Sequence, residues 1–125
     1  MKHSVCRTAE MTERYNSYIE GQSEEEKKNE TLLVAPQDMV AEYTLWFIKK
    51  NKFPYDGILD THDMLVPKRV FGTYAEATPE EKAEFEEIRS SLAHTYDAML
   101  TNFPQNRSIM GHYHVHLISW KGIEE

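Results

Sequence analysis

The feature that most constrains the fold of this chain is the segment 111–118, where histidines alternate with apolar residues. The histidines are His112, His114 and His116, and the apolar residues are Tyr113, Val115 and Leu117. Successive side chains of a β-strand point to opposite faces, so the alternation predicts a strand with a row of imidazoles on one face and a core on the other. Because imidazole titrates near neutral pH, this row predicts a reactive surface.

Composition limits the class of protein. The chain has 125 residues, enough for one domain with a real core, and it is 40% hydrophobic and 28% charged, as globular proteins are. Its net charge of −7 and its lack of a basic block argue against nucleic acid as a partner. The single cysteine, Cys6, excludes an internal disulfide framework. With no signal-peptide pattern and no long apolar run, we expect a cytoplasmic protein without a membrane partner.

The chain divides into a polar N-terminal extension at 1–30 and a domain at 31–125. In the extension, apolar residues at helical spacing predict a helix over 9–20 that ends at Gly21. In the domain, short apolar and β-branched runs between turn residues predict strands. We expect these strands at 31–35, 43–48, 64–67, 106–110 and 112–118.

The clearest helix signal begins at Thr78. Thr78 fits a cap residue, Pro79 the first helical position and Glu81 the third, which together form a capping box. Apolar residues then follow at helical spacing, namely Phe85, Ile88, Leu92, Tyr96 and Met99. They predict a helix of roughly 20 residues that ends near Asn102 and Pro104. The strands and this helix together predict an α+β fold, with the helix packed on one face of a sheet.

The histidine row suits two kinds of chemistry. Neutral imidazoles can converge on zinc or a related ion, although three-histidine zinc sites usually take their third ligand from another strand. An imidazole can also attack a phosphoryl group and form a phosphoramidate. Its neighbours would then orient it, bind phosphate oxygens or protonate the leaving group. The residues alone leave both chemistries open.

The segment 112–118 fits the pattern His-φ-His-φ-His-φ-φ, in which φ is apolar, and so resembles the histidine triad (HIT) family. The segment 62–69, which ends in Val-Pro-Lys-Arg, resembles that family's His-x-x-x-(Val/Ile)-Pro-Lys-Arg strand. The segment 51–55 resembles its nucleotide-contacting strand end, and the helix at Thr78 resembles its single long helix. Asn102 and Ser108 resemble the asparagine and serine that precede the triad. The resemblance covers residues 31–120.

The resemblance implies a HIT-like antiparallel sheet of about five strands with one long helix, in a homodimer that shares a continuous sheet. It implies a nucleotide hydrolase or nucleotidyl transferase that acts at the α-phosphate. The substrate would be a dinucleoside polyphosphate, a nucleoside phosphoramidate or another adenylylated compound. His114 would be the nucleophile that carries a covalent nucleotidyl group. The other implied site residues are His112 and His116 beside it, His62 on the neighbouring strand, and Asn51, Asn102 and Ser108 as substrate contacts.

No cofactor is required by this chemistry, although a divalent cation could accompany a polyphosphate substrate. Two alternatives stay open. The clustered histidines could instead make the chain a metal-binding protein or metalloenzyme, or the same fold could serve as a non-catalytic nucleotide sensor. Lys68 and Arg69 either face the phosphates of a ligand or form a solvated strand end.

Overall fold

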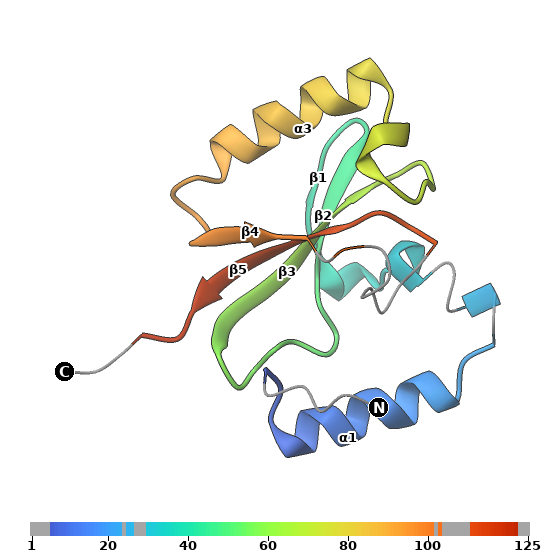
Figure 1. Cartoon of the computed structure of the whole chain (residues 1–125), viewed down its shortest axis with the longest axis vertical. Helices are drawn as coiled ribbons and strands as arrows, with labels where there is room; N and C mark the ends of the chain where they lie inside the picture. Colours follow the sequence, from blue (N-terminus) through green and yellow to red (C-terminus); the bar gives the residue numbers. More distant parts are fainter. Residues whose placement is uncertain (1–5, 24, 27–29, 102, 104–110, 123–125) are drawn as a thin grey trace.

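A computed structural model describes residues 6–23, 25–26, 30–101, 103 and 111–122. In this part of the chain, an antiparallel sheet of five strands has the order β1-β2-β3-β5-β4, and two α-helices accompany it (Figure 1). The helices are α1 (Ala9–Glu20) and α3 (Pro79–Ser91). The strands are β1 (Met39–Glu42), β2 (Trp46–Lys50), β3 (Leu59–Pro67), β4 (Ala98–Leu100) and β5 (Val115–Trp120). The α+β class and the antiparallel five-stranded sheet are therefore confirmed.

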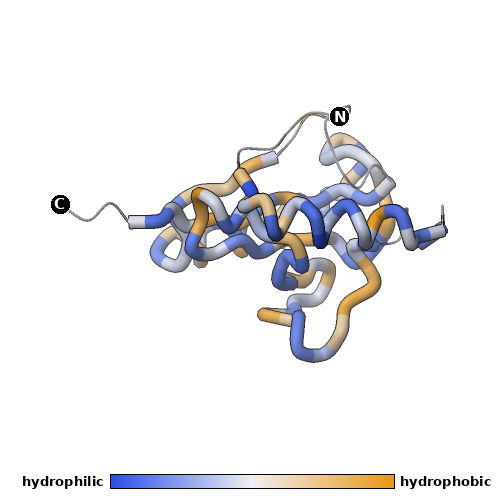
Figure 2. The backbone as a smooth tube through the Cα atoms, turned by 90° about the horizontal axis from the view of Figure 1, so that it is seen from below, coloured by the Kyte–Doolittle hydropathy of each residue, from blue (hydrophilic) through white to orange (hydrophobic). Residues whose placement is uncertain are grey.

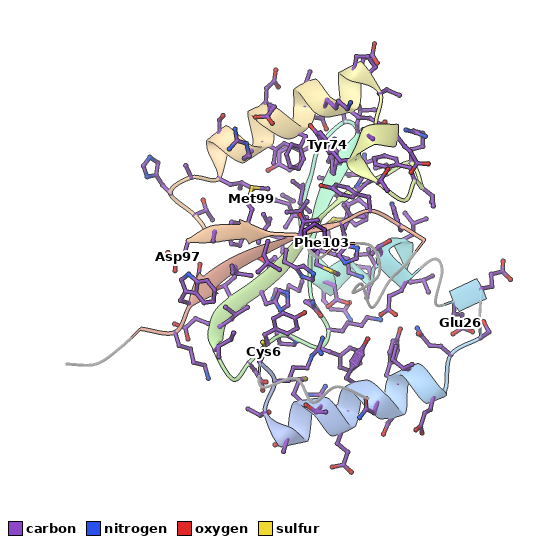
Figure 3. All side chains as sticks on the ribbon, viewed as in Figure 1. Cys6, Glu26, Tyr74, Asp97, Met99 and Phe103 are labelled. Carbon is purple, nitrogen blue, oxygen red and sulfur yellow. The ribbon has the colours of Figure 1, made fainter. Side chains whose placement is uncertain are left out.

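Helix α3 begins where the sequence predicts it. The Thr78 side chain accepts a hydrogen bond from the Glu81 backbone N–H at 3.1 Å, and the Glu81 carboxylate accepts one from the Thr78 N–H at 2.7 Å. Phe85 and Ile88 are buried on the face that α3 turns toward the sheet. Side chains fill the space between the helix and the strands, with Tyr74 among them (Figure 3).

The predicted length of this helix is wrong. Helix α3 spans 13 residues and ends at Ser91, and Met99 lies in β4 instead. After the helix, the Asp97 N–H donates to the Ile118 carbonyl at 2.8 Å, and Met99 pairs with Leu117 of β5. Pairing with β5 satisfies the backbone N–H and C=O groups of this segment, so it forms a strand even though its apolar residues recur at helical spacing. The spacing misled because Leu92, Tyr96 and Met99 do pack against the same core.

The strand boundaries also differ from the prediction. The expected strand at 31–35 is wrong, because a 3₁₀ helix spans Glu30–Leu32 and is followed by irregular chain. The strand expected at 43–48 begins only at Trp46, and the preceding edge strand β1 was not predicted. Strand β1 is short and largely exposed, so it lacks the alternation that marks a half-buried strand. The strand expected at 64–67 is the end of β3, and the one at 106–110 lies outside the described residues.

The N-terminal helix and the hydropathy of the chain also bear on the sequence predictions. The helix predicted over 9–20 is confirmed as α1, with Gly21 at its end. Hydrophobic and hydrophilic residues follow each other over short stretches of the chain (Figure 2). In the described residues, no helix combines the length and apolar character that crossing a membrane requires. The boundary between the extension and the domain at residue 30 stays a prediction.

Candidate active site

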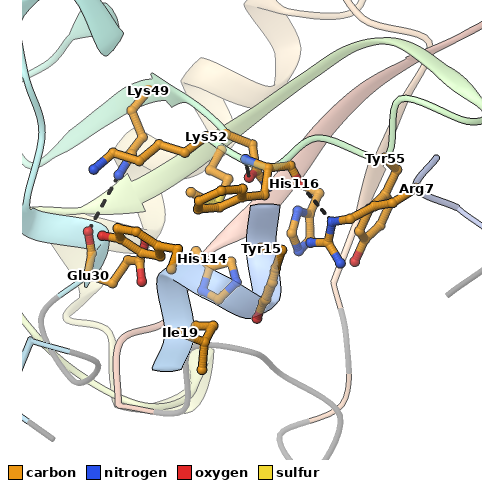
Figure 4. A pocket seen from close by; sticks show the side chains of 13 residues that line it. Arg7, Tyr15, Ile19, Glu30, Lys49, Lys52, Tyr55, His114 and His116 are labelled. Carbon is orange, nitrogen blue, oxygen red and sulfur yellow. Dashed lines mark hydrogen bonds between the residues drawn. The ribbon is translucent and has the colours of Figure 1, made fainter. Parts of the chain in front are cut away.

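The histidine row lies where three strands meet a cavity beside α1. Strand β5 begins at Val115, later than predicted, so His112 and His114 directly precede it. The alternation itself holds, because Tyr113, Val115 and Leu117 all belong to the core on the α3 side. His114 and His116 line a cavity on the opposite face (Figure 4). The cavity is also lined by α1, through Tyr15, Tyr18 and Ile19.

The ring of His114 is held in one tautomer. Its Nδ1 lies 2.9 Å from the backbone carbonyl oxygen of His112, and because a carbonyl only accepts, Nδ1 carries the proton and donates it. In a neutral imidazole the other nitrogen, Nε2, then keeps its lone pair. His114 is 4% exposed, and its ring meets that of His116 edge-on at 5.2 Å. The protein thus orients an imidazole that can act as a nucleophile or as a ligand.

His62 and His116 form a hydrogen-bonded pair beside it. The Tyr55 backbone N–H donates to His62 Nδ1 at 3.0 Å, so a neutral His62 carries its proton on Nε2. That nitrogen lies 2.7 Å from His116 Nδ1 and donates to it. His116 therefore carries its own proton on Nε2. A backbone amide thus fixes the tautomers of both rings.

Burial keeps this pair neutral. Burial, with smaller contributions from the positive charge of Arg7 and from His114, lowers the pKa of His62 to about 4. Burial also lowers the pKa of His116 to about 3, with additional repulsion from His114 and His62. Both rings are 5% exposed. At neutral pH the pair can therefore donate a hydrogen bond to an anion without carrying a charge.

His112 occupies a different environment. Its ring is fully buried, its Nε2–H donates to the Pro67 carbonyl at 2.8 Å, and its Nδ1 accepts a hydrogen bond from the Thr31 hydroxyl. Burial lowers its pKa. His112 is not among the described residues that line the cavity. Its ring ties the end of β3 to the 3₁₀ helix at Glu30–Leu32, while its carbonyl orients His114.

The structure places one further predicted site residue at the cavity. Asn51 lines the cavity, its Oδ1 accepts from the Phe53 backbone N–H at 2.9 Å, and its amide nitrogen lies 3.3 Å from His62 Nε2. Asn102 and Ser108 lie outside the described residues. The two basic residues after β3 pair with carboxylates instead of facing the cavity, Lys68 with Glu42 at 3.0 Å and Arg69 with Glu81 at 2.9 Å.

Several cavity residues were not predicted. Arg7 stacks over the rings of Tyr15 and Tyr55, with its guanidinium 4.4 Å and 4.8 Å from their centroids, and its Nε–H donates to the Phe53 carbonyl at 2.8 Å. Lys49 is also in the cavity wall although it is only 1% exposed. The alternation Phe47, Lys49 along β2 could have placed this lysine on the inner face. No local pattern indicates Arg7, because Phe53 and Tyr55, which bring it to the cavity, are more than forty residues away in the chain.

The described residues contain no group of three or more His, Cys, Asp or Glu side chains placed to hold a metal ion. Comparison with protein-family models finds no matching family, and comparison with curated proteins finds no matching sequence. The assignment of a function to this chain therefore depends on the chemistry of the site.

Proposed function

We propose that this chain is a nucleotide hydrolase or nucleotidyl transferase that acts at an α-phosphate through a covalent intermediate on His114. The observation that carries the proposal is the hydrogen bond from His114 Nδ1–H to the His112 carbonyl. It leaves the Nε2 lone pair of a cavity-lining imidazole as the nucleophile. We also propose that the sheet and α3 form a HIT-like arrangement and that the chain is a homodimer.

The proposed reaction has two displacements. In the first, the Nε2 lone pair of His114 forms a P–N bond as the bond from phosphorus to the leaving group breaks, and the leaving group departs with that electron pair. The ring becomes cationic, and its Nδ1–H remains bonded to the His112 carbonyl dipole, which stabilises the charge. In the second, water or another acceptor attacks phosphorus, the P–N bond breaks, and its electron pair returns to Nε2. The acceptor loses a proton as it bonds to phosphorus, and this proton neutralises the leaving group that departed with its electron pair in the first displacement.

His116 is the proposed partner of the phosphate. A neutral ring with its proton on Nε2 can donate to a phosphate oxygen or to the leaving group. His62 acts through His116, because its hydrogen bond at 2.7 Å fixes which nitrogen of His116 carries the proton. His112 is a positioning residue in this proposal. Asn102 and Ser108 keep their predicted roles as substrate contacts.

The test is release of AMP from adenosine phosphoramidate and from a dinucleoside polyphosphate. The proposal expects turnover of at least one of them, with activity on the phosphoramidate retained in the presence of a chelator. Loss of that activity on chelation, together with stoichiometric zinc, nickel or iron in the purified protein, would establish the metalloenzyme alternative instead. Binding of AMP without turnover of either substrate would indicate a nucleotide sensor.

A further inference from the structure

A buried lysine shares the cavity with the histidines. Lys49 of β2 pairs with Met64 of β3, and Met64 pairs with His116 of β5, so the three side chains form one row across the sheet. Neighbouring strands lie about 4.8 Å apart, which separates the Lys49 and His116 backbones by roughly 10 Å. All three residues line the cavity. The Lys49 side chain thus lies in the same cavity-facing row as His116, two strand spacings away.

This ammonium has fewer partners than its burial requires. Lys49 is 1% exposed, and within the described part of the chain its Nζ makes one hydrogen bond, a long one of 3.4 Å to the Glu30 carbonyl, and no ion pair. The Glu30 carboxylate instead accepts from Gln22 at 3.2 Å. The carboxylates of Glu30 and Asp38 attract the ammonium, but neither forms an ion pair with it in the described part of the chain. An ammonium has three N–H donors, and burying it without an ion pair is costly. Its position therefore calls for an anion that the cavity can admit.

A second lysine, Lys52, lines the same cavity as Lys49 and adds a positive charge to it. Lys52 is exposed and lines the cavity, with its Nζ 5.3 Å from the centroid of Tyr18. Burial lowers the pKa of Lys49 and repulsion from Lys52 adds to this, whereas the carboxylates of Glu30 and Asp38 oppose the shift. In Figure 4 the two amines lie together on one side of His114, and Arg7 lies on the other.

We propose that Lys49 and Lys52 form a second anion-binding site, which takes a phosphoryl group further along the substrate than the one that His114 attacks. A phosphoryl group supplies the charge and the acceptor oxygens that two ammonium groups lack here. This inference rests on the proposed function. It adds a preference for ligands with two linked phosphoryl groups over ligands with one.

The experiment compares the affinities of AMP and ADP by calorimetry, with His114→Asn in every protein so that turnover cannot interfere. Lys49→Met and Lys52→Met remove one charge each while keeping an unbranched side chain. Lys50→Met is the matched control, because Lys50 is exposed and the strand alternation directs it to the other face. Unfolding curves establish that each variant folds. Should Lys49→Met fail to fold, the exposed Lys52→Met carries the test.

We expect ADP to bind at least tenfold more tightly than AMP when both lysines are present. Loss of a charge-assisted hydrogen bond predicts that Lys49→Met weakens ADP binding roughly tenfold to a hundredfold and changes AMP binding less than twofold. Lys52→Met should have a smaller effect in the same direction, and Lys50→Met none. If AMP binds but neither lysine substitution changes the ratio of ADP affinity to AMP affinity, the second anion-binding site is wrong while the proposed function stands. Failure of both nucleotides to bind would overturn the proposed function as well.

Discussion

Neighbouring residues of β5 and of the segment directly before it serve different functions on the two faces of the sheet. On the α3 side, Val115 and Leu117 are buried in a continuous apolar cluster with Trp46. On the α1 side, His114 and His116 line a cavity. None of the twelve residues of α1 is buried, whereas α3 buries residues against the sheet.

This contrast indicates that the α3 face of the sheet mainly stabilises the fold, whereas the α1 face holds the candidate active site. Helix α3 is held by burial, which is strong and non-directional. Helix α1 is held at its beginning by polar contacts, such as the bonds from Thr8 to Asp56 at 2.9 Å and 3.0 Å. Further along the helix, Tyr15 and Tyr18 pack against the ring of Phe53. Contacts of that kind leave room for a cavity between the helix and the sheet. We therefore expect substitutions on the two faces to separate activity from stability.

The largest expected effect is that of His114→Asn. Loss of the nucleophile should lower turnover roughly a thousandfold or more, while nucleotide binding and the unfolding free energy stay close to those of the natural chain. Steady-state kinetics and a binding titration measure both. His94→Asn, at an exposed position after α3, is the control. Turnover at the natural rate in His114→Asn would show that the nucleophile is assigned wrongly.

The next largest effect is expected on the opposite face. Leu117 is fully buried, so Leu117→Ala should lower the unfolding free energy by about 2–5 kcal/mol through lost burial and the cavity it leaves. Activity per folded molecule should stay near the natural value. Urea unfolding and active-site titration test this pair of expectations. A fully stable variant with lost activity would contradict the division between the faces.

The pH dependence of stability tests the neutral histidine pair. Folding lowers the pKa of His62 to about 4 and that of His116 to about 3, below the value near 6.5 in an unfolded chain. Below pH 6.5 the unfolded state then binds more protons, so this stability is present above pH 6.5 and is lost as pH falls toward about 4 for His62 and about 3 for His116. From pH 7 to 5 we expect a loss of about 2 kcal/mol per histidine. The double variant His62→Gln, His116→Gln should flatten this slope, and an unchanged slope would refute the explanation.

The smallest effects are expected from substitutions of the residues that cap the two helices. Thr78 caps α3 and Thr8 caps α1, each accepting a hydrogen bond from a backbone N–H. Thr78→Ala should lower the global unfolding free energy by about 1 kcal/mol, because α3 unfolds only with the core. Thr8→Ala should instead increase hydrogen exchange in α1 with little change in global stability. Equal global losses would mean that α1 belongs to the same cooperative unit.

Local patterns account for what the sequence predicts well. The alternation at 112–118 places Tyr113 and Leu117 in the core and His114 in the cavity because a strand has only two faces. The start of α3 follows from a capping box that four consecutive residues supply. Both features depend on neighbours in the chain, and short-range chemistry determines them.

Long-range contacts account for what the sequence does not reveal. Helix α3 ends early because the backbone beyond it pairs with β5, a strand some twenty residues further on. The ring of His112 is turned from the cavity by Thr31 and Pro67, and Arg7 reaches the site through contacts with Phe53 and Tyr55. None of these partners is indicated by a residue's own neighbours. The sequence therefore misses Arg7 and does not reveal the orientation of the His112 ring, because distant residues determine both.

The most direct test of the central claim is the intact mass of the protein after brief incubation with adenosine phosphoramidate or a dinucleoside polyphosphate, handled without acid to preserve a P–N bond. The proposed mechanism predicts a mass gain of one nucleotidyl group, which His114→Ala abolishes. The absence of an adduct with both substrates, with no AMP released, would contradict covalent catalysis by His114.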